Sequence, residues 1–387
     1  MELIKLTNRG LYCEPGDFYI DPWKSVPRAI VTHAHSDHAH YGMDSYIAEK
    51  KSVDIMRLRV GRDAKIEGRD YGETFFMNDV KVSLHPAGHI FGSSQVRVEY
   101  QGEVWVFTGD CKRDFDPSCT PFEVVKCDTF ITEATFALPI YQWTETSLVV
   151  KDIYEWWMKN RERGMNSILC VYALGKAQRV LAELLRYTNE TVHLHGALLQ
   201  LTQAYREAGI QMVPTVSALS ATDTPDAAKG DKAKKEKLKG ALILAPPSAA
   251  GSVWTRRFEP YEVGFASGWM AVRGNRRRNA YDRGFVISDH SAWNSLIRTI
   301  EETGCKRVLA THGSSEVLAR YVTEEMGLVG EVLKTEFNPE EDASDTVSDA
   351  AGNGAPEEVR AEKRVSLLQE KPVRKKKATS APETDAS

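Results

Sequence analysis

The stretch His33-Ala34-His35-Ser36-Asp37-His38 decides the fold prediction. It follows directly on Ala29 to Thr32, a short run rich in apolar and β-branched residues that predicts a strand. A loop at the end of a strand can aim several side chains at one point. Imidazole nitrogens together with one carboxylate suit Zn²⁺ and, less selectively, Mn²⁺ or Fe. The stretch therefore predicts a metal site, and the alternative is a polar loop with incidental histidines.

Three more residues of ligand type follow predicted strands. His89 lies in a glycine-flanked turn after the apolar run 80–84, Asp110 follows the run 104–108, and His312 follows the run 307–310. Each position alone is a weak signal, but each repeats the placement of the first motif. Since one loop cannot close two metal sites, we expect these side chains to complete the site.

Taken together, these motifs resemble those of the metallo-β-lactamase superfamily. The resemblance implies an α/β fold, a four-layered αββα sandwich with a two-metal cleft at one edge. A metal pair about 4 Å apart can hold a hydroxide between its ions and stabilise the attacking and leaving oxygens of a displacement, which suits phosphodiester hydrolysis. The implied cofactors are two divalent ions, zinc first, with Mn or Fe as alternatives. The implied ligands are His33, His35 and His89 for one metal, Asp37, His38 and His312 for the other, and Asp110 as the bridge.

The segment 111–311 is longer than a small hydrolase of this superfamily needs, and it resembles the β-CASP branch, which processes nucleic acids. A predicted strand ends at Glu133, the stretch 168–178 reads as a strand, a glycine turn and a helix start, and Ser288-Asp289-His290 follows an apolar run. The resemblance implies that Glu133 orients and charges His290, which protonates the departing 3′ oxygen; a histidine held by a carboxylate is a suitable general acid. From the residues alone, His290 could equally be a loop histidine. The expected catalytic residues are Asp37, Asp110, Glu133 and His290.

The expected domains are the first part of the metallo-β-lactamase lobe at 1–150, an inserted β-CASP-like α/β domain at 151–283, a return segment at 284–336 and a disordered charged tail at 337–387. The tail has no Phe, Tyr or Trp from residue 338 onward, so it cannot bury enough apolar surface to fold. Its basic end, 374–377, either stays solvated or touches DNA or a partner. The lysine-rich stretch 221–240 predicts a solvated helix or loop.

Basic residues near the predicted site are candidates for contacts to phosphate groups. The arginine run leads directly into the predicted catalytic strand, where guanidinium groups can make bidentate, salt-dependent contacts to a polyanion. A lysine at a helix start and two basic residues directly after Asp110 are further candidates. The alternative for all of them is a solvated surface. The set is Lys112, Arg113, Lys176, Arg273, Arg276, Arg277 and Arg278.

Four other histidines are not expected to bind metal. His40 is expected beside the cluster or on the surface, and His85 at a strand end. His193 and His195 have His-x-His spacing but no nearby third ligand, so we expect them at a strand edge of the inserted domain, where facing the substrate is the alternative role.

The amino-acid sequences of the stretches 10–23, 267–274 and 288–291 resemble those of the bacterial ligase-associated DNA exonucleases. The whole resemblance covers about residues 3–335. This resemblance implies a DNA substrate and work beside a DNA ligase and a helicase. One departure is that related Artemis-type nucleases generally lack a histidine at the last ligand position. Thr311-His312-Gly313 resembles the RNA-processing members instead.

Composition narrows the class of protein. The chain has 387 residues, a net charge of −4 and 42% hydrophobic residues, which fits two globular domains. It lacks a membrane-length apolar run and Cys-x-x-Cys pairs, and residues 1–10 lack a signal-type apolar region, so we expect a cytoplasmic protein without a membrane partner. The leading hypothesis is a metal-dependent DNA exonuclease in repair. The alternatives are an RNA-processing nuclease, a small-molecule hydrolase of the superfamily, and a nucleic-acid-binding scaffold with an inactive site.

Overall fold

Two sheets packed face to face carry the predicted ligand loops. The computed structural model describes residues 2–219, 238–272 and 281–335. The first sheet has the strand order β1 (Ile4–Leu6), β2 (Leu11–Cys13), β3 (Phe18–Ile20), β4 (Ala29–Ile30), β5 (Tyr46–Glu49) and β6 (Ile66–Arg69). The second has the order β19 (Val329–Val332), β18 (Arg307–Thr311), β11 (Thr129–Glu133), β10 (Glu103–Phe107), β9 (Ser94–Tyr100), β8 (Val80–Pro86) and β7 (Thr74–Met77).

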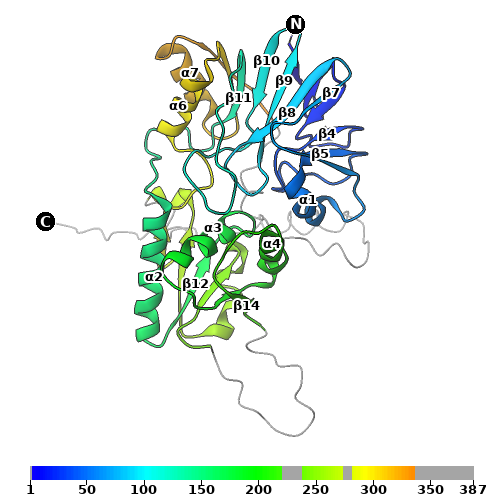
Figure 1. Cartoon of the computed structure of the whole chain (residues 1–387). Coiled ribbons are helices and arrows are strands. Elements are labelled where there is room, and N and C mark those ends of the chain that lie inside the picture. Colours follow the sequence, from blue (N-terminus) through cyan, green and yellow to red (C-terminus); the bar gives the residue numbers. More distant parts are fainter. Residues whose placement is uncertain (1, 220–237, 273–280, 336–387) are drawn as a thin grey trace, which may run out of the picture. The chain divides into compact units, whose positions relative to one another are not determined.

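The apolar residues of these strands fill the space between the two sheets. Val80, Val82 and Leu84 alternate along β8 and pack in one cluster with Phe18 and Ile20 of β3. Helices cover the outer faces: α1 (Val53–Val60) packs on the first sheet, and α6 (Trp293–Thr303) and α7 (Ser315–Glu324) pack beside β11 on the second (Figure 1). The predicted αββα layering is therefore confirmed.

Strand direction explains why the ligand loops meet. Strands β10, β11 and β18 are mutually parallel, and β8 points the same way because β9 is antiparallel to both β8 and β10. The carboxyl ends of parallel strands lie at one edge of a sheet. The loops after β8, β10, β11 and β18 therefore open at the same edge.

A third, wholly parallel sheet is built from the middle of the chain. Its strand order is β14 (Thr215–Ser217), β13 (Val192–Leu194), β15 (Leu242–Ala245), β12 (Asn166–Cys170), β16 (Tyr261–Ala266) and β17 (Arg283–Phe285). β12 and β15 are buried along their whole length, as is typical of parallel strands covered on both faces. The helices connected with it are α2 (Thr146–Glu162), α3 (Lys176–Glu183) and α4 (Gly196–Glu207).

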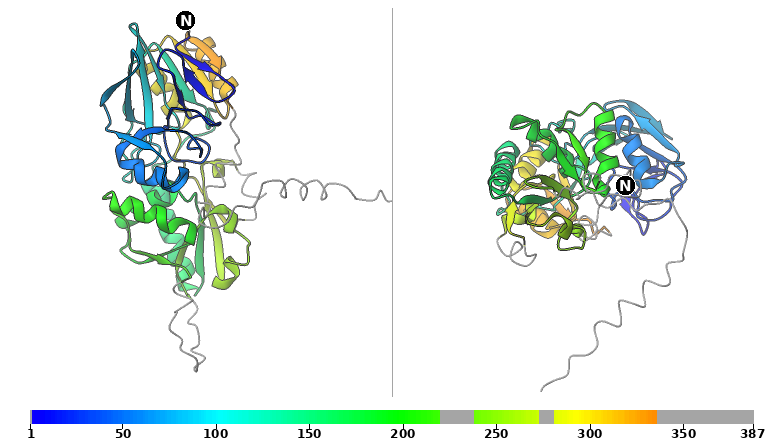
Figure 2. Two further views of the ribbon diagram at one scale, coloured as in Figure 1. Left: turned by 90° about the vertical axis from the view of Figure 1, so that its right-hand side faces the viewer. Right: turned by 90° about the horizontal axis from the view of Figure 1, so that it is seen from below.

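The third sheet packs against the other two within one compact unit. Helix α4 lies against α1 (Figure 2), and the backbone N–H of Phe91 donates to the hydroxyl of Tyr205 at 3.2 Å. The strands predicted at 80–84, 104–108 and 307–310 appear within two residues of those bounds. One expectation was wrong: the strand with His193 lies inside the sheet, between β14 and β15, and β14 forms the edge.

Two predictions lie partly or wholly outside the described residues, namely the tail at 337–387 and most of the lysine-rich stretch 221–240. The domain boundaries stay a prediction, and α2 runs through the expected boundary at residue 150. Within the described ranges, no helix is long and apolar enough to span a membrane.

Candidate metal centre

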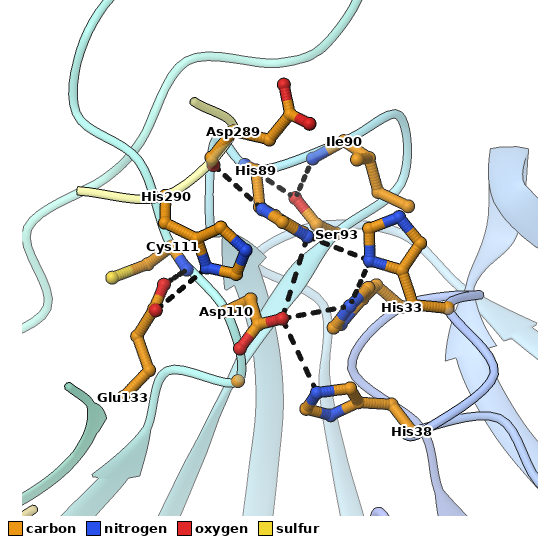
Figure 3. Close-up of polar contacts among 12 residues, drawn as sticks. His33, His38, His89, Ile90, Ser93, Asp110, Cys111, Glu133, Asp289 and His290 are labelled. Carbon is orange, nitrogen blue, oxygen red and sulfur yellow. Dashed lines mark hydrogen bonds and ion pairs between the residues drawn. The ribbon is translucent and has the colours of Figure 1, made fainter. Parts of the chain in front are cut away.

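Four buried side chains form a first group of possible ligands. The Nδ1 atom of His35 lies 3.1 Å from Nε2 of His33 and 3.0 Å from Nε2 of His89. The Oδ2 atom of Asp110 lies 3.5 Å from Nε2 of His33 and 3.7 Å from Nε2 of His89 (Figure 3). Ligand atoms held tetrahedrally about 2.1 Å from one ion would be about 3.4 Å apart, so the spacing fits a metal site.

A second group meets the first at Asp110. Nε2 of His38 lies 3.5 Å from Oδ2 of Asp110 and 3.6 Å from Oδ2 of Asp37. Nδ1 of His312 lies 3.9 Å from Oδ1 of Asp110. Asp110 is therefore the residue that both groups share, at the place expected for a bridge.

Unsatisfied polar atoms support the same reading of the cluster. Both carboxylate oxygens of Asp37, Nε2 of His38 and Oδ1 of Asp110 are buried and have no hydrogen-bond partner among the described residues. A buried polar group without a partner costs about 1–3 kcal/mol, and more when it is charged. Metal ions would satisfy these atoms. The buried His/Asp cluster thus suits a binuclear metal site.

The electrostatics differ across the cluster. Burial, followed by the neighbouring imidazoles, lowers the pKa of His33 well below its usual value, which favours the neutral ring that binds metal. Burial alone would also lower the pKa of His38. The carboxylates of Asp37, Asp110 and Asp21 outweigh it and raise that pKa well above the usual value. An excess of negative charge around His38 therefore favours a cation there, which can be a proton or a metal ion.

Backbone conformation lets the loops approach this closely. Gly109, directly before Asp110, has φ +53°, and a Cβ there would lie 2.6 Å from Oγ1 of Thr32. His312 itself has φ 60° and is followed by Gly313, where a Cβ would lie 2.4 Å from the carbonyl oxygen of Ala134. Glycine is required at both positions because a side chain would collide with the neighbouring loop.

The outer ring nitrogens of the histidines are held by groups that the sequence did not reveal. Nδ1 of His38 donates to Oδ2 of Asp21 at 2.7 Å, Nδ1 of His89 donates to the carbonyl oxygen of Asp289 at 2.8 Å, and Nε2 of His35 donates to that of Leu174 at 3.2 Å. Such partners fix the tautomer and the ring orientation of metal-binding histidines. Asp21, at the end of β3, repeats the strand-end placement that identified the other residues, so that signal could have found it. The two carbonyl groups leave no signal in the sequence.

A carboxylate–histidine pair lies beside the cluster. Nδ1 of His290 is 2.8 Å from Oε2 of Glu133, whose Oε1 accepts the backbone N–H of Cys111 at 2.8 Å (Figure 3). Ligand-type atoms of Asp110, Glu133 and His290 all lie within 4.8 Å of one another. Nε1 of Trp143 donates to the carbonyl oxygen of His290 at 2.9 Å, which anchors the loop.

The basic residues expected to contact phosphate are already paired with carboxylates in the described part of the chain. Lys112 is 1% exposed and donates to Asp114 at 2.8 Å, and Arg113 donates to Glu302 at 2.6 Å. Lys176 is 2% exposed and lies 3.2 Å from a carboxylate oxygen of Asp289. The structure therefore gives these three residues roles within the fold. Arg273, Arg276, Arg277 and Arg278 lie outside the described residues.

The histidines that were set aside do not join the groups of possible ligands found among the described residues. Nε2 of His40 contacts the carbonyl oxygen of Asp37 at 3.0 Å, and Nδ1 of His85 lies 3.2 Å from Glu123. His195 caps the start of α4 by accepting the backbone N–H of Ala197.

No protein-family model matches the chain. A comparison with individual proteins does find relatives. The chain is 29% identical over 320 residues to a "Probable DNA ligase" of Opitutus terrae, covering 82% of this chain and 30% of the ligase. It is 24% identical over 211 residues to an "RNase J-like protein" of Methanocaldococcus jannaschii, covering 47% of this chain and 50% of that protein. It is 31% identical over 128 residues to "Endoribonuclease YSH1" of Gibberella zeae, covering 32% of this chain and 15% of that protein. The chain thus spans half or less of each of these three relatives.

A solved structure from Enterococcus faecalis V583, described as a protein of unknown function, has a similar fold. The TM-score is 0.54 with 12% sequence identity, over 80% of this chain and 79% of that one. At this identity the likeness concerns the fold alone.

Proposed function

We propose that this chain, which has the sequence likeness, layers and His/Asp cluster of β-CASP-type metallo-β-lactamase proteins, hydrolyses phosphodiester bonds in nucleic acid. The observation that carries the proposal is the placement of the Glu133–His290 pair against Asp110. The site thus brings together ligands for metal ions that can activate water and a carboxylate-held histidine that can act as general acid, and the proposed hydrolysis needs both.

Two divalent ions, of which zinc is the first candidate, would lower the pKa of an attacking water and stabilise charge on both reacting oxygens. The ligands would be the residues of the two groups described above, with Asp110 shared between them. The proposed zinc rests on the donor set of imidazoles and carboxylates.

His290 is the proposed general acid. Glu133 accepts from its Nδ1 at 2.8 Å and is itself fixed by the backbone N–H of Cys111. This contact determines which ring nitrogen faces the carboxylate. The other nitrogen, Nε2, is then the atom that would give a proton to the departing oxygen.

The proposed substrate is DNA, cleaved from an end during repair. Support comes from the ligase of Opitutus terrae, whose matching part covers most of this chain, and from the sequence resemblance to ligase-associated exonucleases. A DNA ligase and a helicase are the proposed partners. The arginines at 273 and 276–278 would add contacts to phosphate groups.

RNA is the second candidate substrate, because a specific observation favours it. The RNase J-like and endoribonuclease relatives match this chain, and His312 lies beside Asp110 where RNA-processing members carry a histidine. The two candidates share the same chemistry and differ only in the polymer that is bound.

One experiment tests both. DNA and RNA of the same sequence, single- or double-stranded and labelled at either end, are incubated with the zinc-loaded protein, with His290→Ala as the control. Stepwise loss of nucleotides from DNA supports the proposal, and a clear preference for RNA selects the second candidate. If the metal-loaded protein cleaves neither polymer but hydrolyses thioesters or lactams, the nuclease proposal is wrong.

A further inference from the structure

A fully buried arginine connects helix α3 to two loops of the metal centre. Arg179 is 0% exposed, and its Nη1 donates to the carbonyl oxygen of Ser288 at 2.8 Å. Its Nη2 donates to the carbonyl oxygen of Phe115 at 3.3 Å, and its Nε lies 3.4 Å from Oδ2 of Asp116. One side chain thus ties α3 to the loop that follows Asp110 and to the loop that carries His290.

Lys176 lies one helical turn before Arg179 and therefore on the same face of α3. Its Nζ is 3.2 Å from Oδ2 of Asp289, while Nη1 of Arg179 is 3.5 Å from Oδ1 of the same carboxylate. Burial alone would raise the pKa of Asp289, but these two cations outweigh it and lower that pKa. The ionised carboxylate of Asp289 thus lies between the side chains of Lys176 and Arg179 of α3, an arrangement that we call the α3 clamp.

The clamped residue supports a ligand through its backbone. The carbonyl oxygen of Asp289 accepts the Nδ1–H of His89 at 2.8 Å. The carbonyl oxygen of Leu174, just before α3, accepts from Nε2 of His35 at 3.2 Å. Two of the three histidines of the first group are therefore oriented by carbonyl groups at or beside the α3 clamp.

The approach of this turn to the metal centre depends on glycine. Gly175 has φ +88°, and a Cβ there would lie 2.3 Å from Cγ2 of Ile90 and 4.0 Å from Nε2 of His35. The turn therefore packs directly on the loop that holds His89. A larger residue would push the carbonyl group of Leu174 away from His35.

Stability alone is a poor explanation for this network. Replacing a buried ion pair by apolar residues of similar volume is often neutral or stabilising. By contrast, groups that hold the outer nitrogens of metal-binding histidines typically change metal affinity or activity by about 10–100-fold when they are removed.

We infer that Lys176 and Arg179 are positioning residues that set the metal affinity of the first position, formed by His33, His35 and His89, by clamping Asp289. The inference deepens the proposed function, on which it rests only in requiring that the cluster bind metal. The second position is formed by Asp37, His38 and His312. Asp21 of the first sheet holds the outer nitrogen of His38, so this position is expected to keep its affinity.

The test is a titration of the full-length, metal-free protein with Zn²⁺ against a competing chelator, and with Co²⁺ followed by its absorption spectrum. Lys176→Gln removes the cation beside Asp289, and it is expected to weaken one of the two binding steps about 10–100-fold. The other step stays unchanged. Lys176→Arg, which keeps the ion pair, is expected to restore both the affinity and the Co²⁺ spectrum.

Arg206→Lys is the matched control. Arg206 lies on α4, another helix that packs on the third sheet, and donates to the carbonyl oxygens of Met212 and Val213. It is expected to lower the melting temperature without changing either binding step. A loss of affinity in this control would show that general loosening of the fold, and not the clamp, explains the effect.

Wild-type affinities at both steps in Lys176→Gln and in Arg179→Lys would overturn the inference, whatever the nuclease assays give. If Arg179→Lys does not fold, Lys176→Gln together with Asp289→Asn decides. If the affinities change as expected but no nucleic acid is cleaved by the wild type, the proposed function fails and the inference stands.

Discussion

The two groups of possible ligands share Asp110 but are supported in different ways. In the second group, Nδ1 of His38 donates to Asp21 at 2.7 Å, and Asp21 also accepts from the backbone and hydroxyl groups of Thr32 at 2.8 and 2.6 Å. All of this support lies at the ends of β3 and β4. In the first group, His35 and His89 are held by the carbonyl groups of Leu174 and Asp289, which come from distant segments.

The difference teaches that the histidine support of one metal position comes from the first sheet, whereas the histidine support of the other is complete only with the third sheet in place. The charges differ in the same sense. Three carboxylates surround His38 and raise its pKa, whereas burial and neighbouring rings lower the pKa values of His33 and His89. We therefore expect the two positions to respond separately to substitution, except at the residue they share.

Asp110→Ala should have the largest effect because it removes the shared carboxylate. Two cations would then face each other without a negative charge between them. The purified protein is expected to hold less than one metal ion per chain, measured by elemental analysis, and to lose all activity. Retention of two ions would show that Asp110 is not a bridge.

His290→Ala should separate the chemistry from both metal positions. Its ring contacts Glu133, whereas the carbonyl group of its neighbour Asp289 supports His89. Metal content is expected to stay at the wild-type level while the turnover rate falls about 10²–10⁴-fold, a typical range for a lost general acid. Loss of metal would instead mean that this imidazole is itself a ligand.

Asp21→Asn should act mainly on the second position, because Asp21 contacts His38 directly and reaches His33 only through the hydroxyl group of Thr32. It weakens the charged partner of His38, so the affinity of one binding step is expected to fall about 10–100-fold in a Zn²⁺ titration. The step that Lys176→Gln weakens should keep its affinity. If both substitutions weaken the same step, the proposed division between the positions is incorrect.

The smallest effect concerns acid stability of the metal-free protein. Burial would raise the pKa of Asp289, but Lys176 and Arg179 lower it below the usual carboxyl value. The stabilisation from this group is therefore fully present above the unfolded-state pKa and is lost as the pH falls through the folded-state value. Between about pH 5 and about pH 2, the free energy of unfolding should fall less steeply in Asp289→Asn than in the wild type. Urea unfolding at a series of pH values measures this slope, and equal slopes would contradict the assignment.

The layered fold and the gathering of the ligand residues could be predicted because each ligand-type residue follows a strand, and parallel strands end at one edge. The supporting contacts could not. Leu174 and Asp289 act through backbone carbonyls, which every residue has. Likewise, Lys112 and Lys176 were expected to contact phosphate groups, but in the structure they pair with the carboxylates of Asp114 and Asp289. A sequence shows the charge of a side chain, whereas its partner depends on the packing of distant segments.

The close packing of Gly175 against Ile90 also bears on how such a protein can be engineered. The middle of the chain is not a removable module: a shortened version without the third sheet would lose the carbonyl groups that orient His35 and His89. Replacing this sheet with that of a relative would succeed only if the inserted segment included the glycine turn before α3 and a matching loop at position 289.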